Sequence, residues 1–273
     1  MSNNAIKAYE NLMAKINEAY PTLSNRLKDI ASFALEHPTS MALETIATIA
    51  EEAKVPPSAL IRFGKALGYN GFSEMQRVFQ SYVAVQTASY KERIHQDMVD
   101  LDNEEENSPV SLLAKYCKEN IISLEHLRNG ISPHSLTKAV RLIKEADHIY
   151  LSGVRRSLPV ATYLSYMLSH AGCKAHLLDG IGGMLTEQCS NIEDSDLLIV
   201  TSFHPYSSEA QNIVQQALEK NIPLIAISDN NLSPICRNAD VAFIVHDAEV
   251  HSFRSLTATM VLAQTLATSL LFS

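Results

Sequence analysis

The sequence predicts a chain of two domains: an all-α domain, followed by an α/β domain built on a five-stranded parallel sheet. Three observations lead to this prediction. Residues 1–85 follow a helical pattern throughout, and residues 148–245 alternate short β-rich runs with helical segments. Between them, residues 86–110 are polar and contain an acidic run, which is typical of a solvated connector. We therefore expect domains at residues 1–85 and 111–273, joined by a linker at 86–110.

The composition excludes several classes of protein. Hydrophobic residues make up 46% and charged residues 19% of the chain, so it can bury a core and is not disordered. No apolar run reaches the roughly 18 residues of a membrane-spanning helix, and the first residues lack the apolar stretch of a signal peptide. The four cysteines, at positions 117, 173, 189 and 236, lie far apart without a C-x-x-C pair, so we expect reduced thiols. We predict a cytoplasmic protein without a metal or another cofactor.

The charge of the chain is unevenly distributed. The net charge is −8, yet residues 1–90 hold eight Lys/Arg and eight Asp/Glu and are formally neutral. The remaining residues account for the whole deficit. A small dimeric DNA reader needs only a few basic side chains on one face, so a neutral helical domain is compatible with DNA binding.

The first domain contains a helix pair with the spacing of a helix-turn-helix. Four helices are expected, at residues 25–35, 45–53, 57–67 and 72–85. The residue before a proline is pushed out of the helical region, so His37 ends the first of them, whereas Pro57 suits the first turn of the third. A tight turn at Lys54–Pro56 joins the second helix to the third, as in a helix-turn-helix.

The second helix of this pair carries the candidate base-reading side chains. We expect Leu60, Ile61 and Phe63 to face the core and Ser58, Ala59, Arg62 and Lys65 to face outward. Arg62 is the best candidate to contact a base, because its guanidinium matches the acceptors of guanine in the major groove. Lys54 and Lys65 are expected near phosphates. The alternatives are a plain helical bundle with solvated Arg and Lys, and a module that does not bind DNA.

Residues 21–75, which end in ETIATIAEEAKVPPSALIRFGKALGYNGFSEM, resemble the N-terminal domain of the RpiR family of bacterial sugar-metabolism regulators. The most specific part runs from Val55 to Phe72 and contains R-F-x-K-x-L-G-Y-x-G-F. The family's usual Ser or Thr at the start of the recognition helix is Pro56 here, which removes a side-chain cap. The resemblance implies a double-stranded DNA operator as partner. The residues implied at the DNA are Lys54, Ser58, Arg62, Lys65, Tyr69 and Asn70.

The β-rich runs of the second domain predict a doubly wound sheet. They lie at residues 148–152, 174–178, 196–201, 222–228 and 240–245. Helical segments separate them at residues 158–171, 184–189, 208–220 and 232–237, and an apolar helix at 256–271 closes the chain as core or subunit interface. Strands and helices that alternate in this way form parallel sheets, and we expect the strand order 2-1-3-4-5.

Two loops of this sheet have the composition of an anion site. In the expected order, ligands bind at the carboxyl ends of strands 1 and 3. The loops that leave there, residues 152–157 and 202–209, carry hydroxyl groups and lead into helices, whose N-termini favour anions. Arg155 and Arg156 add charged donors suited to phosphate.

Residues 111–273 resemble a sugar isomerase (SIS) domain, the usual partner of the RpiR-type helix-turn-helix. The family's G-x-G-x-S pattern appears as Gly153, Arg155 and Ser157, with the second glycine replaced. Its S-x-S-G-x-T/S-x-E pattern appears as Ser202, His204, Pro205, Ser207 and Glu209. The resemblance implies that Ser157, Ser202 and Ser207 bind a phosphate or sugar, and a phosphorylated sugar is the favoured ligand. The candidate ligand-binding residues are Ser152, Gly153, Arg155, Arg156, Ser157, Glu187, Ser202, His204, Ser207 and Arg254.

Both halves together predict a transcriptional regulator of carbohydrate metabolism, not an enzyme, whose operator binding is modulated by a phosphorylated sugar. We expect a homodimer or higher homo-oligomer that forms through the second domain, including its last helix, because a single helix-turn-helix usually binds as a dimer. His251 and Arg254 are expected at the start of that helix. The alternative is a sugar-phosphate isomerase or related enzyme with a helical accessory domain, in which His204, Glu187 and His251 would act as acid and base.

Overall fold

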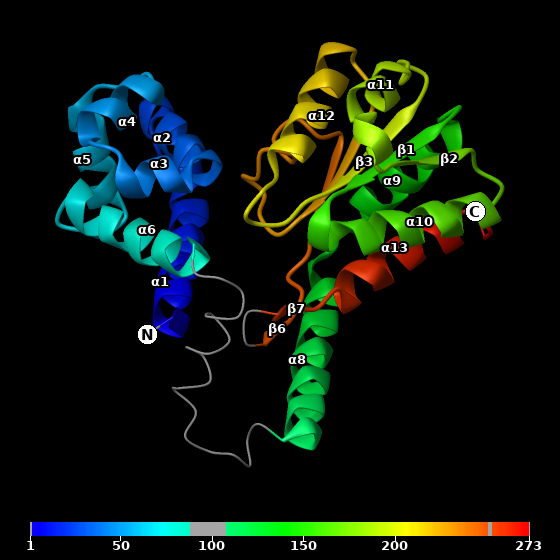
Figure 1. Ribbon diagram of the computed structural model, residues 1–273, viewed down its shortest axis with the longest axis horizontal. Helices are drawn as coiled ribbons and strands as arrows, with labels where there is room; N and C mark the ends of the chain where they lie inside the picture. Colours follow the sequence, from blue (N-terminus) through cyan, green and yellow to red (C-terminus); the bar gives the residue numbers. More distant parts are fainter. Residues whose placement is uncertain (1, 88–107, 251–252, 273) are drawn as a thin grey trace. The chain divides into compact units, whose positions relative to one another are not determined.

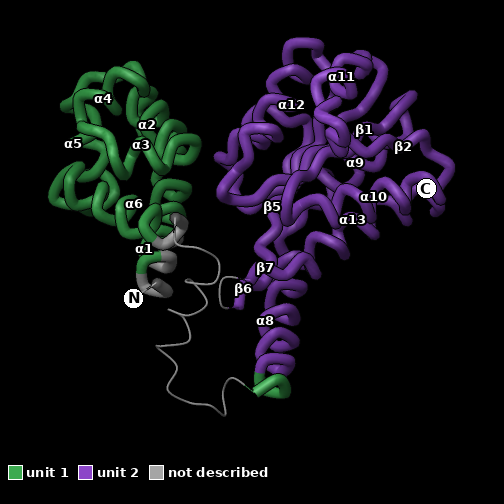
Figure 2. The backbone as a smooth tube through the Cα atoms, viewed as in Figure 1, with its two compact units in different colours: residues 1–111 green, residues 112–273 purple. Residues whose placement is uncertain are grey.

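The computed structural model describes residues 2–87, 108–250 and 253–272, and the chain divides into two compact units, residues 1–111 and 112–273 (Figures 1 and 2). Each unit has its own core and is described by itself. The predicted linker, residues 86–110, lies largely outside the described residues, so its bounds stay a prediction. Within the described ranges, no helix combines the length and the hydropathy needed to cross a bilayer.

The described residues of the first unit form only helices and turns. Its helices are α1 (Ser2–Ala19), α2 (Asn25–Glu36), α3 (Pro38–Leu43), α4 (Ile46–Glu52), α5 (Pro57–Ala66) and α6 (Phe72–Thr87), with a 3-10 turn at Tyr20–Thr22. His37 ends α2 as expected, but Pro38 starts α3 at once, because proline fits the first turn of a helix. The core includes Leu12, Ile16, Ile30, Leu35, Met41, Ile49, Leu60, Phe63, Met75 and Phe79, all fully buried. Because α5 packs against α2, α4 and α6, the helix-turn-helix is part of this core.

The second unit is an α/β unit with the predicted strand order. Its strands are β1 (Ile149–Gly153), β2 (Ala175–Leu178), β3 (Leu197–Thr201), β4 (Leu224–Ser228) and β5 (Val241–Ile244). They form one parallel sheet in the order β2-β1-β3-β4-β5. Since β1 pairs with β3, with Gly153 opposite Thr201, the loops that follow these strands begin side by side.

Helices cover both faces of this sheet (Figure 1). They are α9 (Pro133–Glu145), α10 (Leu158–His170) and α13 (Thr257–Ser269) on one face and α11 (Leu185–Ser190) and α12 (Ser208–Glu219) on the other, preceded by α8 (Pro109–Gly130). Leu197 and Ile199 enter the first core, whereas Leu198 and Val200 enter the second. The burial of both faces explains why β3 is a continuous apolar run rather than an alternating one.

The predicted helix at residues 232–237 is wrong. These residues form turns, and the Leu232 N–H donates to the Asn230 side chain (2.8 Å). An Asn side chain that accepts in this way stabilises a turn in place of a helix. Pro234 lacks the N–H that a helix interior needs, which also favours the turn.

The last helix begins within one residue of its predicted start at Leu256, but Arg254 does not lie at that start as expected, and Asp247 shows where the helix begins. Its carboxylate accepts hydrogen bonds from the N–H groups of Ala258 (2.9 Å) and Thr259 (3.2 Å) and from the Thr259 hydroxyl. A helix N-terminus leaves such N–H groups without intrahelical partners, so these bonds place the start of α13 at Thr257. Arg254 instead belongs to a short antiparallel hairpin, β6 (Glu249–Val250) with β7 (Phe253–Arg254), and His251 lies outside the described residues.

Candidate functional sites

Local hydrogen bonds hold the turn between α4 and α5. Thr45 caps α4 by accepting from the Thr48 N–H (3.2 Å), and the Val55 N–H donates to the Ala50 carbonyl (2.8 Å). Lys54 adopts a positive φ of 54°, in the left-handed region. The chain therefore turns from α4 into α5 within the four residues 53–56, as a helix-turn-helix requires.

The loop after α5 packs closely against that helix. The Tyr69 N–H donates to the Gly64 carbonyl (3.0 Å), and a Cβ at Gly64 would lie 2.6 Å from the Gly71 carbonyl oxygen. Only glycine permits such an approach of two backbones. Asn70, a candidate at the DNA, donates from its backbone N–H (2.7 Å) and its side-chain amide (2.9 Å) to Glu74. The backbone N–H of Asn70 and one N–H of its side-chain amide are thus bound within the unit.

The outward face of α5 differs from the prediction at two positions. Ile61, expected in the core, is 43% exposed, and Ala59, expected outside, is fully buried. The helix phase explains both, because successive residues turn by about 100° and the buried side is centred near Leu60 and Phe63. The exposed side chains at helical spacing, termed the recognition face, are Ser58, Ile61, Arg62 and Lys65. Pro56 gives α5 no side-chain cap, as expected.

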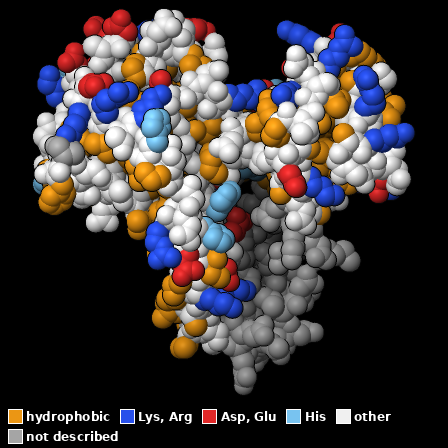
Figure 3. Space-filling view, turned by 180° about the vertical axis from the view of Figure 1, so that it is seen from behind, with side chains coloured by type: hydrophobic (Ala, Val, Ile, Leu, Met, Phe, Trp, Pro, Cys, Tyr) orange, Lys and Arg blue, Asp and Glu red, His pale blue; other side chains and the backbone are white. Residues whose placement is uncertain are grey.

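Basic side chains lie on and beside the recognition face. Arg62 and Lys65 belong to it, and Lys54 in the preceding turn is also exposed. Figure 3, in which the helical unit lies on the right, shows Lys and Arg side chains along its outer edge with few acidic ones among them. Such a surface suits a polyanion, because each cation that pairs with a phosphate releases counterions from the DNA.

In the α/β unit, the loops after β1 and β3 contact each other. Arg156, in the 3-10 turn Arg155–Ser157 that follows β1, donates from Nη2 to the His204 carbonyl oxygen (3.2 Å). Arg155 is exposed, and its positive charge acts on Glu209 in the first turn of α12. The pKa of Glu209 there is lowered first by its own backbone hydrogen bond and, among smaller causes, by Arg155. The two loops thus form one polar edge of the sheet.

The predicted serines lie at this edge and are buried. Ser152 lies in the last two residues of β1 and Ser157 in the turn that follows; a Cβ at Gly153, between them, would lie 2.5 Å from the Ser157 carbonyl oxygen. Ser202 follows β3, and its carbonyl accepts from the Ser228 hydroxyl (2.8 Å). Ser207 caps α12 by accepting from the Ala210 N–H (3.1 Å), which places its hydroxyl at a helix N-terminus.

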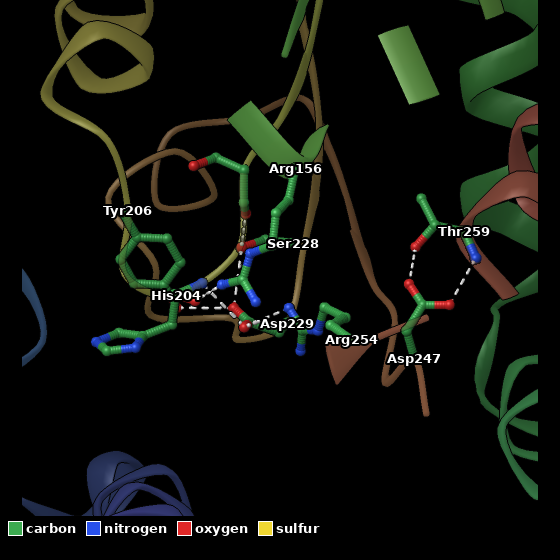
Figure 4. Close-up of polar contacts among 9 residues, drawn as sticks. Arg156, His204, Tyr206, Ser228, Asp229, Asp247, Arg254 and Thr259 are labelled. Atoms are coloured by element: carbon green, nitrogen blue, oxygen red, sulfur yellow. Dashed lines mark hydrogen bonds and ion pairs between the residues drawn. The ribbon is translucent and has the colours of Figure 1, made fainter. Parts of the chain in front are cut away.

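Asp229, which the sequence analysis did not single out, joins these loops to β7 (Figure 4). It directly follows β4; its Oδ2 accepts from the His204 N–H (3.0 Å) and pairs with Arg254 Nη1 (3.0 Å). Its Oδ1 accepts from the Tyr206 hydroxyl (2.9 Å). The Arg254 and Asp229 side chains are only 11% and 13% exposed, and the Arg254 guanidinium lies 4.5 Å from the Phe203 ring centroid. We refer to Asp229, Arg254, His204 and Tyr206 as the Asp229 cluster.

The charge state of this cluster follows from its surroundings. Burial alone would raise the pKa of Asp229, but the Arg254 guanidinium and the His204 N–H outweigh it and hold that pKa below its ordinary value. Burial lowers the pKa of His204 to about 4, with Arg254 and Arg156 acting in the same direction and Asp229 against it. At neutral pH, Asp229 is therefore charged and the His204 imidazole is neutral. In Figure 4 this imidazole points away from the carboxylate.

Two buried polar atoms at this edge have no hydrogen-bond partner among the described residues. They are Ser152 Oγ, at the end of β1, and Nε of Arg254. An unsatisfied buried polar atom costs about 1–3 kcal/mol and is uncommon, so such atoms suggest where ligand atoms bind. Glu187 lies exposed in the first turn of α11. In the described part of the chain, no group of three or more His, Cys, Asp or Glu is placed to hold a metal ion.

Two family models match the chain. The helix-turn-helix domain of the rpiR family matches residues 10–86, and the SIS domain matches residues 142–269. A helix-turn-helix-type transcriptional regulator of Haemophilus influenzae is 25% identical over 236 residues, which are 86% of this chain and 79% of the relative.

Two solved structures share the fold. The sugar isomerase domain of an RpiR transcription factor from Sphaerobacter thermophilus has 25% identity and a TM-score of 0.57, and the match covers 59% of this chain and 90% of that one. The Vibrio vulnificus NanR protein has 20% identity and a TM-score of 0.56, and the match covers 96% of this chain and 91% of that one. The second match therefore extends over both units.

The fold, the two sites and these matches define a class of protein: a helix-turn-helix transcriptional regulator whose second domain has the sugar isomerase fold. The chain belongs to the RpiR family. The resemblance noted from the sequence and the predicted fold class are thereby confirmed for both halves.

Proposed function

We propose that this protein binds double-stranded operators through the recognition face of α5 and that a phosphorylated sugar modulates this binding from the carboxyl ends of β1, β3 and β4. The observation that carries the proposal is the polar edge of the sheet, where buried serines, exposed arginines and the unpaired Ser152 Oγ and Arg254 Nε meet. The NanR protein, which shares the fold, was solved in complex with ManNAc-6P, and this supports a phosphosugar as the class of ligand. The regulated genes then belong to carbohydrate metabolism.

Arg62→Ala tests the DNA-binding half of the proposal. We expect operator affinity to fall by about 1–3 kcal/mol, with relaxed base preference at one position, because a bidentate contact to guanine is lost. Folding should be unaffected, since Arg62 is exposed. The matched control is Arg77→Ala, which removes an exposed arginine from α6 instead of α5. Equal affinity of wild type and Arg62→Ala in a gel-shift titration would remove α5 from the recognition role.

Calorimetry with pairs of sugars tests the ligand half. Each sugar of a panel of amino-sugar, pentose and inositol-derived compounds is titrated as the phosphate and as the unphosphorylated parent. We expect binding of one phosphorylated member, and Arg155→Ala should weaken it, because a charged hydrogen bond contributes about 1.5–3 kcal/mol. Arg141→Ala, an exposed arginine of α9, is the control. Equal affinity for a sugar phosphate and its unphosphorylated parent would show that these loops do not bind the phosphate group.

We propose a homodimer as the active state, because a symmetric operator has two half-sites and each binds one helix-turn-helix domain. The predicted surface is the second domain including its last helix, but much of that helix packs within its own unit: Leu262 and Leu266 of α13 are buried there. A better candidate is α8, where Val110, Leu113, Cys117 and Ile121 are exposed at helical spacing. Light scattering should give a dimer for wild type and a monomer for Leu113→Glu. A wild-type monomer at micromolar concentration would contradict the proposal.

We also propose that the α/β unit senses its ligand without converting it, in the cytoplasm where operators are accessible. The relatives' names support this, and so does the site. An isomerase needs a free base beside the substrate carbon, whereas the Asp229 carboxylate accepts from His204, Tyr206 and Arg254, and an exposed Glu187 is not shielded from water. Turnover of any bound sugar phosphate in an NMR time course would overturn this part.

A further inference from the structure

We infer that Ile61 is a specificity residue that contacts the methyl group of a thymine in the major groove of the operator. The inference rests on the proposed operator binding by α5 and adds a second base contact to that of Arg62. It starts from the difference between the predicted and observed burial of Ile61, which is 43% exposed.

The core of the helical unit does not need Ile61. Ala59, Leu60 and Phe63 of the same helix are fully buried and supply its packing surface. A single exposed isoleucine is ordinary on a protein surface, so exposure alone carries no meaning. The position of Ile61 is informative, because it lies between Ser58 and Lys65 on the recognition face and directly precedes Arg62.

The charges around Ile61 indicate what covers it. Exposed Lys54, Arg62 and Lys65 accompany the isoleucine, so the complementary partner is an anion that also offers an apolar group. Double-stranded DNA fits this description, because the methyl group of thymine is the apolar group that its base edges present in the major groove. An α-helix that directs Arg62 at one base pair brings Ile61, about 100° around the helix axis, to an adjacent one. Arg62 then selects guanine and Ile61 selects thymine.

Replacing thymine by deoxyuridine tests this contact, because the exchange removes only the methyl group. Operators are first selected from a randomised duplex library with the full-length protein. Each thymine of the selected duplex is then replaced singly. We expect one thymine per half-site at which deoxyuridine weakens wild-type binding about fourfold, the fold-change that corresponds to roughly 0.8 kcal/mol for one buried carbon.

Ile61→Ala should bind the thymine operator about fourfold or more weakly and should no longer distinguish thymine from deoxyuridine at that position. The matched control is Leu43→Ala, which shortens a side chain on α3 that is 69% exposed, and it should keep the full deoxyuridine effect. Arg62→Ala should also keep it. If Ile61→Ala melts at a lower temperature, the deoxyuridine series on the wild type still decides, since it changes the DNA alone.

Two results would overturn the inference while leaving operator binding intact. One is a wild type that binds every deoxyuridine duplex as tightly as its thymine parent. The other is an Ile61→Ala variant that still distinguishes the two bases, in which case another side chain contacts the thymine methyl group. A library that yields no selected duplex would instead contradict operator binding itself, and this inference with it.

Discussion

Replacing Asp229 by alanine tests whether the Asp229 cluster stabilises the ligand-binding loops. The carboxylate pairs with Arg254 at 3.0 Å, and both side chains are almost nine-tenths buried. Removal of one partner leaves a buried, uncompensated guanidinium, which typically costs about 3–5 kcal/mol. The His204 N–H and the Tyr206 hydroxyl also lose their acceptor. We therefore expect the α/β unit to lose about 3–5 kcal/mol of stability, a large part of a typical domain's total.

Hydrogen exchange measured by mass spectrometry is the suitable assay, because it reports the opening free energy of each unit within the full chain. Amides of β3 and β4 should exchange roughly a hundredfold faster or more in Asp229→Ala, whereas amides of α5 and α6 keep their rates. Asp194→Ala, which removes an exposed carboxylate from the same unit, is the control. A loss below about 1 kcal/mol would show that solvent screens the pair and that the loops do not depend on it.

Three further predictions concern single residues. The pKa of His204 in the folded protein, about 4, lies below the ordinary 6.5, so the stability that the neutral imidazole contributes is complete above pH 6.5 and is lost as the pH falls through 4. His204→Gln should therefore reduce the difference between the free energies of urea unfolding at pH 7 and pH 5. An unchanged difference would contradict this. Gly64→Ala should destabilise the helical unit by about 1–3 kcal/mol through its clash with the Gly71 carbonyl, whereas Gly71→Ala, which meets nothing within 4 Å, should cost less in the same melting experiment. Thr45→Ala should cost about 1 kcal/mol, because the Thr48 N–H loses its cap; an unchanged melting temperature of the helical unit would refute that role.

The elements of both units were predictable because local rules determine them. Pro57 at a first helical turn and the short apolar strands each act within a few residues, and the strand order follows from the alternation of strands with helices. It was harder to predict which side chains of α5 face the core. Ala59 is small enough for either side of a helix, and Ile61 is apolar, so hydrophobicity alone assigned both to the wrong side.

The Asp229 cluster could not be predicted in full because it depends on tertiary pairing. Asp229 and Arg254 lie 25 positions apart, and their contact requires a hairpin whose strands have two residues each. Part of the signal was present nonetheless. Asp229 directly follows the predicted fourth strand, and the carboxyl end of every strand in such a sheet reaches the same edge. Extending the search from strands 1 and 3 to strand 4 would have found it.

Of the two loops that depart from the SIS patterns, the second, residues 202–209, is bound directly by Asp229. His204 stands where the pattern has a serine, and its N–H and carbonyl are bound by Asp229 and Arg156. A ligand that displaced these bonds would also disturb the buried Asp229–Arg254 pair, so binding that leaves them intact costs less free energy. The ligand must then use groups outside this set. Exposed Arg155 meets this condition, and a charged ligand held mainly by an exposed arginine should bind more weakly as the salt concentration rises.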